Sequence, residues 1–345
     1  KFEQNEGTYL NPENNVPEDG LYSAGISFSL GQGFWINERM ATLKQAKLFR
    51  EQSKADRDLL VNQILFKASL AYFDWLQAYN EMEIFNNFYA NAQIRFVGIK
   101  QSALAGEIAA IDTVEAKIVV QDRALGLEQA KVRMMNKSLE LSNFLWLNDN
   151  VPIELQSNVV PDSRLDEDID TTLEIMGKPL DSFSIENHPK LKSLNYKIEG
   201  LEVDKRFKAN KLLPKIDLEY NFITETPELI NSLETQNYKA GINFQLPLFL
   251  RKERGDLKLA KFKLQDAQFE LDNTQIELRN KIIAIYRELE SFEVQNQLIA
   301  DIVNNYQAML TAEERKFSFG ESSIFLINSR ENKLIDSELK KNQVQ

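Results

Sequence analysis

The sequence predicts a mainly α protein with a small β part, built from two copies of one strand-and-helix unit. Three patterns support this fold class: a long internal repeat, apolar residues in heptads over very long stretches, and short segments in which apolar and polar residues alternate. Heptads indicate coiled-coil helices, and alternation indicates strands with one apolar face. We therefore expect long α-hairpins joined to short β-hairpins in each half.

The repeat keeps an offset of 214 to 216 residues. The segment YSAGISFSL at 22–30 returns as YKAGINFQL at 238–246, with six of nine positions identical. Downstream, Leu43 and Gly106 have counterparts in Leu257 and Gly320. Matches that keep register over this distance indicate a tandem duplication.

Each copy begins with strands. Residues 1–36 are expected to form the β-hairpin of the first half, with its opening strand largely missing before Lys1, and residues 214–250 that of the second half. Alternation alone fits either a hairpin packed on a soluble core or a strand facing lipid. Aromatic residues at the strand ends, Phe34, Trp35 and Phe249, favour the membrane, because aromatic side chains gather at its interfaces.

A long α-hairpin should follow each β-hairpin, over 37–149 and, truncated, over 251–345. From Asn37 to Leu104 there is no Pro, and a helix of that length would span about 100 Å. One seam runs from Ala68 to Ile99 at spacings of three and four, and the returning helix places apolar residues seven apart from Ile111 to Trp146. A coiled-coil rod is the ordinary interpretation of such a helix. Further apolar residues outside the seam widen the stripe and favour the wall of a tube.

Two glycines mark the reversals of the helices. Gly106 and Gly320 each follow a long helix, where a residue with positive φ commonly ends it. Ser322 and Ser323 can then cap the returning helix of the second half. Between the halves, an acidic, irregular segment at 150–186 and a helix at 187–213 should lead to the second β-hairpin.

The composition argues against several functions. There is no Cys and only one His, His188, so neither a Cys-ligated zinc site nor a His-based catalytic or metal site is expected. A net charge of -11 argues against nucleic acid, and no phosphate-binding glycine loop occurs. We expect no enzyme activity and no cofactor. No apolar run reaches the ~18 residues of a membrane-spanning helix.

Several segments are family-like: GEIAAIDTVEA at 106–116, NHPKL at 187–191 and LLPKI at 212–216. In their order and spacing, with duplicated halves and very long helices, they make the chain similar to the TolC family of outer-membrane factors. This resemblance covers nearly the whole chain. It implies a homotrimer with a 12-stranded β-barrel in the outer membrane of a Gram-negative bacterium, a periplasmic α-barrel, and an equatorial belt to which 150–186 would contribute.

Strand number independently predicts assembly. Four strands cannot close a barrel, and an open sheet edge leaves unpaired backbone groups in lipid. Membrane barrels start at about eight strands, so at least two chains are needed. Three chains would supply twelve strands and a wider lumen than eight, which fill their interior with side chains.

The resemblance also implies a periplasmic entrance at the helical turns, gated by acidic side chains and contacted by an adaptor. Candidate residues of this tip are Gly106, Asp112, Glu115, Phe317, Gly320, Phe325 and Leu326. After Gly320 the positions equivalent to Asp112 and Glu115 are Leu326 and Ser329, so the second copy departs from the acidic pattern. Asp112 fits an acidic ring and a solvated helix face about equally.

The expected function is the outer-membrane channel of a tripartite efflux or type I secretion system. It would be a passive duct that works with a periplasmic adaptor (membrane fusion) protein, an inner-membrane pump and outer-membrane lipid. The alternative is a non-membrane coiled-coil scaffold. A second rival, an enzyme that uses Asp112 and Glu115, lacks a pocket-forming segment around them. Both chain ends look trimmed, so a lipid on a lost N-terminal Cys stays open, and the sequence does not specify substrate, pump or channel state.

Overall fold

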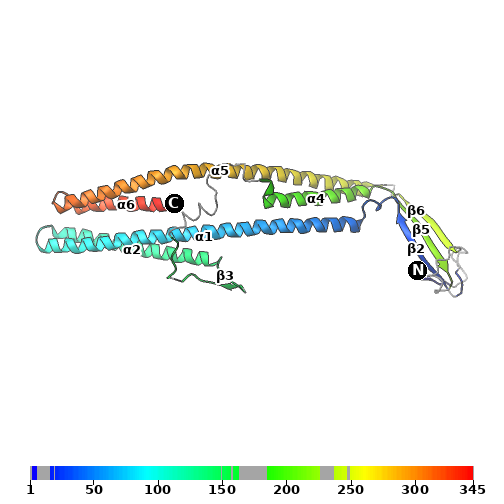
Figure 1. Ribbon diagram of the computed structural model, residues 1–345, viewed down its shortest axis with the longest axis horizontal. Helices are drawn as coiled ribbons and strands as arrows, with labels where there is room; N and C mark the ends of the chain where they lie inside the picture. Colours follow the sequence, from blue (N-terminus) through cyan, green and yellow to red (C-terminus); the bar gives the residue numbers. More distant parts are fainter. Residues whose placement is uncertain are drawn as a thin grey trace. The chain divides into compact units, whose positions relative to one another are not determined.

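A computed structural model describes residues 2–5, 16–18, 20–148, 150–156, 158–162, 185–225, 237–246 and 249–344. Its strands are β1 (Phe2–Glu3), β2 (Leu21–Ser29), β3 (Trp146–Leu147), β4 (Val151–Pro152), β5 (Lys215–Thr224) and β6 (Tyr238–Gln245). Its helices are α1 (Glu38–Leu104), α2 (Ala110–Ser142), the short 3-10 helix η3 (Ile185–Asn187), α4 (Pro189–Asn210), α5 (Arg251–Ser318) and α6 (Ile324–Val344) (Figure 1). The predicted mainly α fold with few strands is confirmed.

The duplication is visible in the element order. A strand, a helix of 67 or 68 residues, a glycine turn and a returning helix occur in each half. Most of the predicted equatorial segment, 163–184, and most of both predicted hairpin loops lie outside the described residues.

The chain divides into two compact units, and each is described by itself. The strand unit comprises 1–59 and 184–278, and the turn unit comprises 60–183 and 279–345. Among the described residues, no helix has a segment apolar enough to cross a membrane.

The strand unit holds one antiparallel sheet in the order β1-β2-β5-β6. The two halves meet in it, because β2 from the first half pairs with β5 from the second, with Ile26 opposite Tyr220. Pro214 precedes β5, where its missing N–H does not interrupt the ladder.

Helix α4 lies along both long helices in the strand unit. The Gln45 side chain donates to the Gly200 carbonyl at 3.4 Å, and Lys197 pairs with Glu270 at 2.7 Å. At the end of α4, buried Asn210 accepts a hydrogen bond from Gly33 N–H at 2.8 Å. This bond attaches the loop after β2 to α4, so the helix fixes the connection between sheet and helices.

The turn unit is a bundle of α1, α2, α5 and α6. Trp75, Ala71 and Leu141 form the core between α1 and α2, and Phe88, Leu310 and Leu334 belong to the core shared by α1, α5 and α6. Every predicted seam residue of α1 from Ala68 to Ile99 is buried or half-buried, as expected for a coiled-coil core. In α5, Ile299 and Leu310 are buried, whereas Ile285, Leu289 and Phe292 are exposed.

Helix α2 ends earlier than its heptad pattern suggested. It stops at Ser142, and Trp146 lies in β3, paired with β4. Ser142 Oγ accepts a hydrogen bond from Leu155 N–H at 3.0 Å, and Asn150 adopts a positive φ of 59° in the connecting turn. A side-chain bond and a tight hairpin here replace another helical turn, so Trp146 is not part of the helical stripe.

We expect Trp75→Ala to lower the free energy of unfolding by about 3–5 kcal/mol, because the indole is only 3% exposed in the α1–α2 core. Trp35→Ala is the matched control, since Trp35 is 76% exposed. Urea unfolding in detergent, followed by circular dichroism, measures both. Equal losses in the two variants would contradict this assignment of the core.

His188 caps α4 by accepting a hydrogen bond from Lys190 N–H at Nδ1, 3.2 Å away. This bond requires the neutral imidazole, and burial lowers the pKa of His188 below its ordinary value. Its contribution to stability is therefore complete above the unfolded-state pKa and is lost as pH falls through the folded pKa. Asn can cap the helix without titrating. We therefore expect the free energy of unfolding to fall less between about pH 7 and pH 5 in His188→Asn than in the unmodified protein. Parallel urea unfolding curves at several pH values test this, and identical pH profiles would contradict it.

Candidate functional site

The sheet has one continuous apolar face. In the observed register, apolar side chains of β2, β5 and β6 come into line: Ile26 lies across from Tyr220, and Leu218 across from Phe28 and Ile242. Several of them are exposed: Ile26, Phe28, Leu218, Ile242 and Phe244. Exposed apolar patches of this kind mark contact with lipid or another apolar surface.

The opposite face of the sheet is polar. Gly25, Asn221 and Lys239 lie across from one another, and so do Ser29, Asp217 and Asn243. Ser29 donates a hydrogen bond to Asp217 at 2.6 Å. A sheet with one apolar and one polar face suits a boundary between lipid and water.

Aromatic side chains stand beside the strand ends. Phe34 and Trp35 pack edge to face at 5.1 Å, and both are exposed. Phe249 is 77% exposed, with the Arg251 guanidinium 5.8 Å from its ring centre. Exposed amphipathic and aromatic groups at this place are typical of membrane interfaces.

Both helical turns have the same glycine-dependent geometry. Gly106 and Gly320 adopt φ of 80° and 77°, so the expected positive φ is confirmed. Glu107 N–H donates to Ser102 O and Gly106 N–H to Ala103 O, and Glu321 and Gly320 make the equivalent bonds to Lys316 and Phe317. These are Schellman caps, which satisfy the last carbonyls of a helix.

The expected serine caps are confirmed only in part. Ser323 Oγ accepts from Leu326 N–H at 3.4 Å, whereas Ser322 donates to buried Glu313 at 2.7 Å. Ser322 therefore anchors the turn to α5 instead of capping α6.

The turn unit brings the two turns together. Ile99, Ala116 and Ile324 form a buried cluster there, with Ile108 and Phe317 packed against it. Phe317, a candidate tip residue, is therefore part of the packing between the hairpins. Phe325 is 68% exposed and Leu326 38%, so these two candidates present apolar surface.

The two acidic candidates differ in their surroundings. Glu115 accepts a hydrogen bond from the Asn328 amide at 3.2 Å, which ties α2 to α6. Asp112 is half-buried in the first turn of α2. Within the described ranges, no cluster of His, Cys, Asp or Glu could hold a metal ion.

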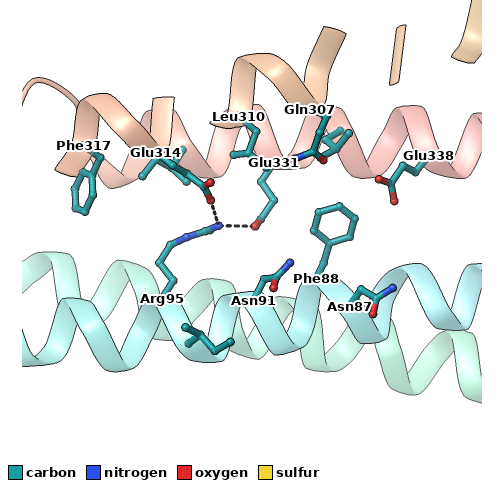
Figure 2. Close-up of a pocket in the computed structure, with 13 residues that line it drawn as sticks. Asn87, Phe88, Asn91, Arg95, Gln307, Leu310, Glu314, Phe317, Glu331 and Glu338 are labelled. Carbon is teal, nitrogen blue, oxygen red and sulfur yellow. Dashed lines mark hydrogen bonds and ion pairs between the residues drawn. The ribbon is translucent and has the colours of Figure 1, made fainter. Parts of the chain in front are cut away.

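A buried ionic cluster joins all four helices and was not anticipated from sequence. Glu331 of α6 is 1% exposed and lies between Arg95 of α1, at 2.8 Å, and Arg123 of α2, at 3.2 Å. Arg95 also contacts Glu314 of α5 at 3.1 Å, as Figure 2 shows. Glu331 and Arg123 are charged residues at buried positions of amphipathic helices, which is a signal that the sequence contains. Their pairing could not be predicted from it, because the two residues are more than 200 positions apart.

The cluster borders a groove of about 550 Å³ between α1, α5 and α6. Amides line it, Asn87, Asn91 and Gln307, together with Glu338 (Figure 2). Burial raises the pKa of Glu338 above its ordinary value. Apolar side chains such as Phe88 and Leu310 complete its lining, so the groove has both polar and apolar walls.

These surfaces and helices define a class: the fold is that of an outer-membrane channel. The chain is similar to the CmeC outer membrane channel of Campylobacter jejuni, with 16% identity, a TM-score of 0.67, and coverage of 100% of this chain and 72% of that one. VceC of Vibrio cholerae has 12% identity and a TM-score of 0.71, and the match covers 100% of this chain and 81% of that one. The open state of the Neisseria gonorrhoeae MtrE channel has 12% identity and a TM-score of 0.60, and the match covers 94% of this chain and 76% of that one.

Residues 182–328 match the outer membrane efflux protein family. Comparison with characterised proteins by sequence alone gave no match. The predicted TolC-like architecture is thus confirmed, and these findings support the efflux channel over the coiled-coil scaffold.

We expect Glu331→Gln to lower the free energy of unfolding by about 3–5 kcal/mol, because it leaves two arginines without their buried carboxylate. The matched control is Glu314→Gln, which removes a carboxylate that is 46% exposed and should cost less than about 1 kcal/mol. Urea unfolding in detergent compares them. If the control were as damaging as Glu331→Gln, the cluster would not hold the bundle as described.

Proposed function

We propose that three copies of this chain form a passive duct across the outer membrane and the periplasm of a Gram-negative bacterium. The observation that carries the proposal is the apolar face of the sheet, which the described residues leave uncovered. A soluble scaffold would bury such a face against its own helices. Lipid covers it if strands from several copies close into a barrel.

The proposed trimer works with a periplasmic adaptor and an inner-membrane pump. Efflux channels of this fold class generally trimerise and act with such partners. The chain itself has no phosphate-binding glycine loop, so the energy for export comes from the pump.

We place the periplasmic entrance at the two turns. In the first half of the chain, Asp112 supplies the acidic character of this entrance, because Glu115 is hydrogen-bonded to Asn328. In the second half of the chain, Phe325 and Leu326 supply an apolar constriction. The exposure of both side chains supports this role. Opening would move the hairpins between two packings of the helices.

The test is ion conductance of the purified protein in a planar lipid bilayer. We expect discrete channel events from detergent-purified protein. A monodisperse oligomer that needs no detergent and gives no conductance would favour the scaffold instead.

A pair of neighbouring substitutions sharpens this test. Ile242→Lys places a charge on the apolar face of β6, where it should cost about 2–4 kcal/mol near the membrane midplane. Asn243→Lys places the same charge on the polar face one residue later. We expect Ile242→Lys to lose membrane insertion and conductance and Asn243→Lys to keep both. If Asn243→Lys were the more damaging, the assignment of the lipid face would be wrong.

A further inference from the structure

The end of the sheet that joins the helices is strongly basic. Helix α1 begins there at Glu38, α4 leads into β5, and α5 begins at Arg251. Residues 38–50, 205–215 and 251–263 together contain fifteen Lys or Arg and three Asp or Glu, in a chain of net charge -11. We call these three segments the basic belt. Positive charge concentrated in this way, against the average of the chain, attracts an anionic partner.

Contacts within the strand unit hold the three segments of the basic belt at one end of the sheet. Lys208 of α4 pairs with Asp256 of α5 at 3.6 Å. Asn210, at the end of α4, accepts a hydrogen bond from Gly33, in the loop that leads to α1. Strand β5 opens at Lys215 beside the last residue of β6. The basic belt is therefore one region of the fold, although its segments are far apart in sequence.

The other end of the sheet has the opposite composition. Residues 4–20 connect β1 with β2, and residues 225–237 connect β5 with β6. These two stretches contain seven Asp or Glu and no Lys or Arg. If the apolar face of the sheet lies in lipid, the two ends of the sheet belong to the two surfaces of the membrane. The basic belt then marks the surface on the side of the helices.

On α5 the basic residues of the belt share one face. Exposed Arg251, Arg254, Lys258 and Lys261 recur at spacings of three and four, and buried Ala260 lies on the opposite side of the helix. None of these four cations makes an ion pair among the described residues. Like charges three or four positions apart destabilise a helix, so bound anions would stabilise this stripe.

Aromatic rings accompany the cations of the belt. The Lys211 ammonium lies 4.5 Å from the ring centre of Phe207. The Lys258 ammonium lies 5.7 Å from that of Phe262, and the guanidinium of Arg251 makes the third such pair of the described residues. A ring beside a cation presents an apolar and a positive group together. That combination suits the layer of a membrane where acyl chains give way to phosphate.

We infer that the basic belt binds the phosphate groups of anionic phospholipids in the periplasmic leaflet of the membrane. Arg254, Lys258 and Lys261 are its central ligands, since ammonium and guanidinium groups both bind phosphate and a guanidinium can do so with two hydrogen bonds. The inference rests on the proposed function, because it needs the apolar face of the sheet to lie in lipid.

Position favours a lipid over a soluble anion as the ligand. Arg251 stands beside the exposed ring of Phe249, and exposed Trp35 precedes Arg39 by four positions. Moving from the sheet to the helices, apolar, aromatic and cationic side chains thus follow one another. The same order of layers is found from the hydrocarbon of a membrane to its charged surface.

Trp35 can report on the lipid next to the belt, since it is 76% exposed between β2 and α1. Trp146→Phe removes the other exposed indole, and Trp75 is buried. The purified protein is placed in vesicles of phosphatidylcholine and phosphatidylglycerol, with one or the other lipid brominated, and quenching of fluorescence gives the occupancy of each. We expect phosphatidylglycerol to be favoured about fivefold or more, the factor that one basic residue contributes near an anionic surface. Equal occupancy would overturn the inference.

Neutralising the α5 stripe tests which residues bind the lipid. We expect Arg254→Gln/Lys258→Gln/Lys261→Gln to bring the preference for phosphatidylglycerol down to a factor of about one, because the charges that attract it are gone. Circular dichroism checks that the helices of the variant are intact.

The matched control removes the same charge from exposed residues of α5 that lie more than twenty positions later: Arg279→Gln/Lys281→Gln/Arg287→Gln. At a rise of about 1.5 Å per residue, these positions are too far along the helix to share a headgroup layer with Arg254. We expect this variant to keep the preference. The same loss in both triple variants would overturn the assignment of the site.

Two further measurements separate a lipid from a soluble anion. If the stripe lined the lumen of the duct, its neutralisation would shift the reversal potential in a KCl gradient towards cation selectivity and leave the lipid preference unchanged. Replacing chloride by inorganic phosphate at matched ionic strength should also leave the preference unchanged. A lumenal effect alone, or a preference abolished by phosphate, would overturn the lipid site.

Quenching by brominated phosphatidylcholine distinguishes failure of this inference from failure of the duct. Quenching by both lipids without preference, together with conductance, would overturn the lipid site and leave the duct standing. A preference for phosphatidylglycerol without conductance would support the lipid site and overturn the duct. Neither quenching nor conductance, in protein with intact helices, would overturn both.

Discussion

The dominant constraint on this protein is the large apolar surface that the chain by itself leaves exposed to solvent. The sheet has one apolar face, and helices α2 and α5 expose further large apolar side chains. Removing such surface from water is the main favourable term in folding and association, at about 25 cal/mol per Å². The alternation of the sheet is the pattern of a strand surface that faces lipid on one side and water on the other, which is why the proposed function rests on it.

Within the copy, the buried ionic cluster has a different role from the apolar core. In coiled coils a buried polar or charged residue can specify the register in which the helices pack. Glu331 between Arg95 and Arg123 allows one register, because a shift would leave buried charges unpaired. The cluster therefore ties the four helices of the turn unit to one another.

The two halves keep the same turn geometry but differ in chemistry. Gly106 and Gly320 are equivalent caps, and a residue with a side chain would be strained at either φ. Six and nine residues after the glycine, the first half has Asp112 and Glu115, whereas the second half has Leu326 and Ser329. The glycine turns that the backbone requires are the same in both halves and these side chains differ, so the proposed entrance combines acidic and apolar residues.

Much of this molecule is encoded locally. The repeat, the seam from Ala68 to Ile99, the alternation in β2, β5 and β6, and both glycine caps were predictable, because each depends on spacing along the chain. The early end of α2 was not, since Ser142 and the β3–β4 hairpin compete with a heptad that continues to Trp146. Tertiary structure alone decided which of two apolar faces of α2 is covered, and which arginines surround Glu331. Those outcomes depend on contacts between residues far apart in sequence, and periodicity shows that a face is apolar without showing what lies against it.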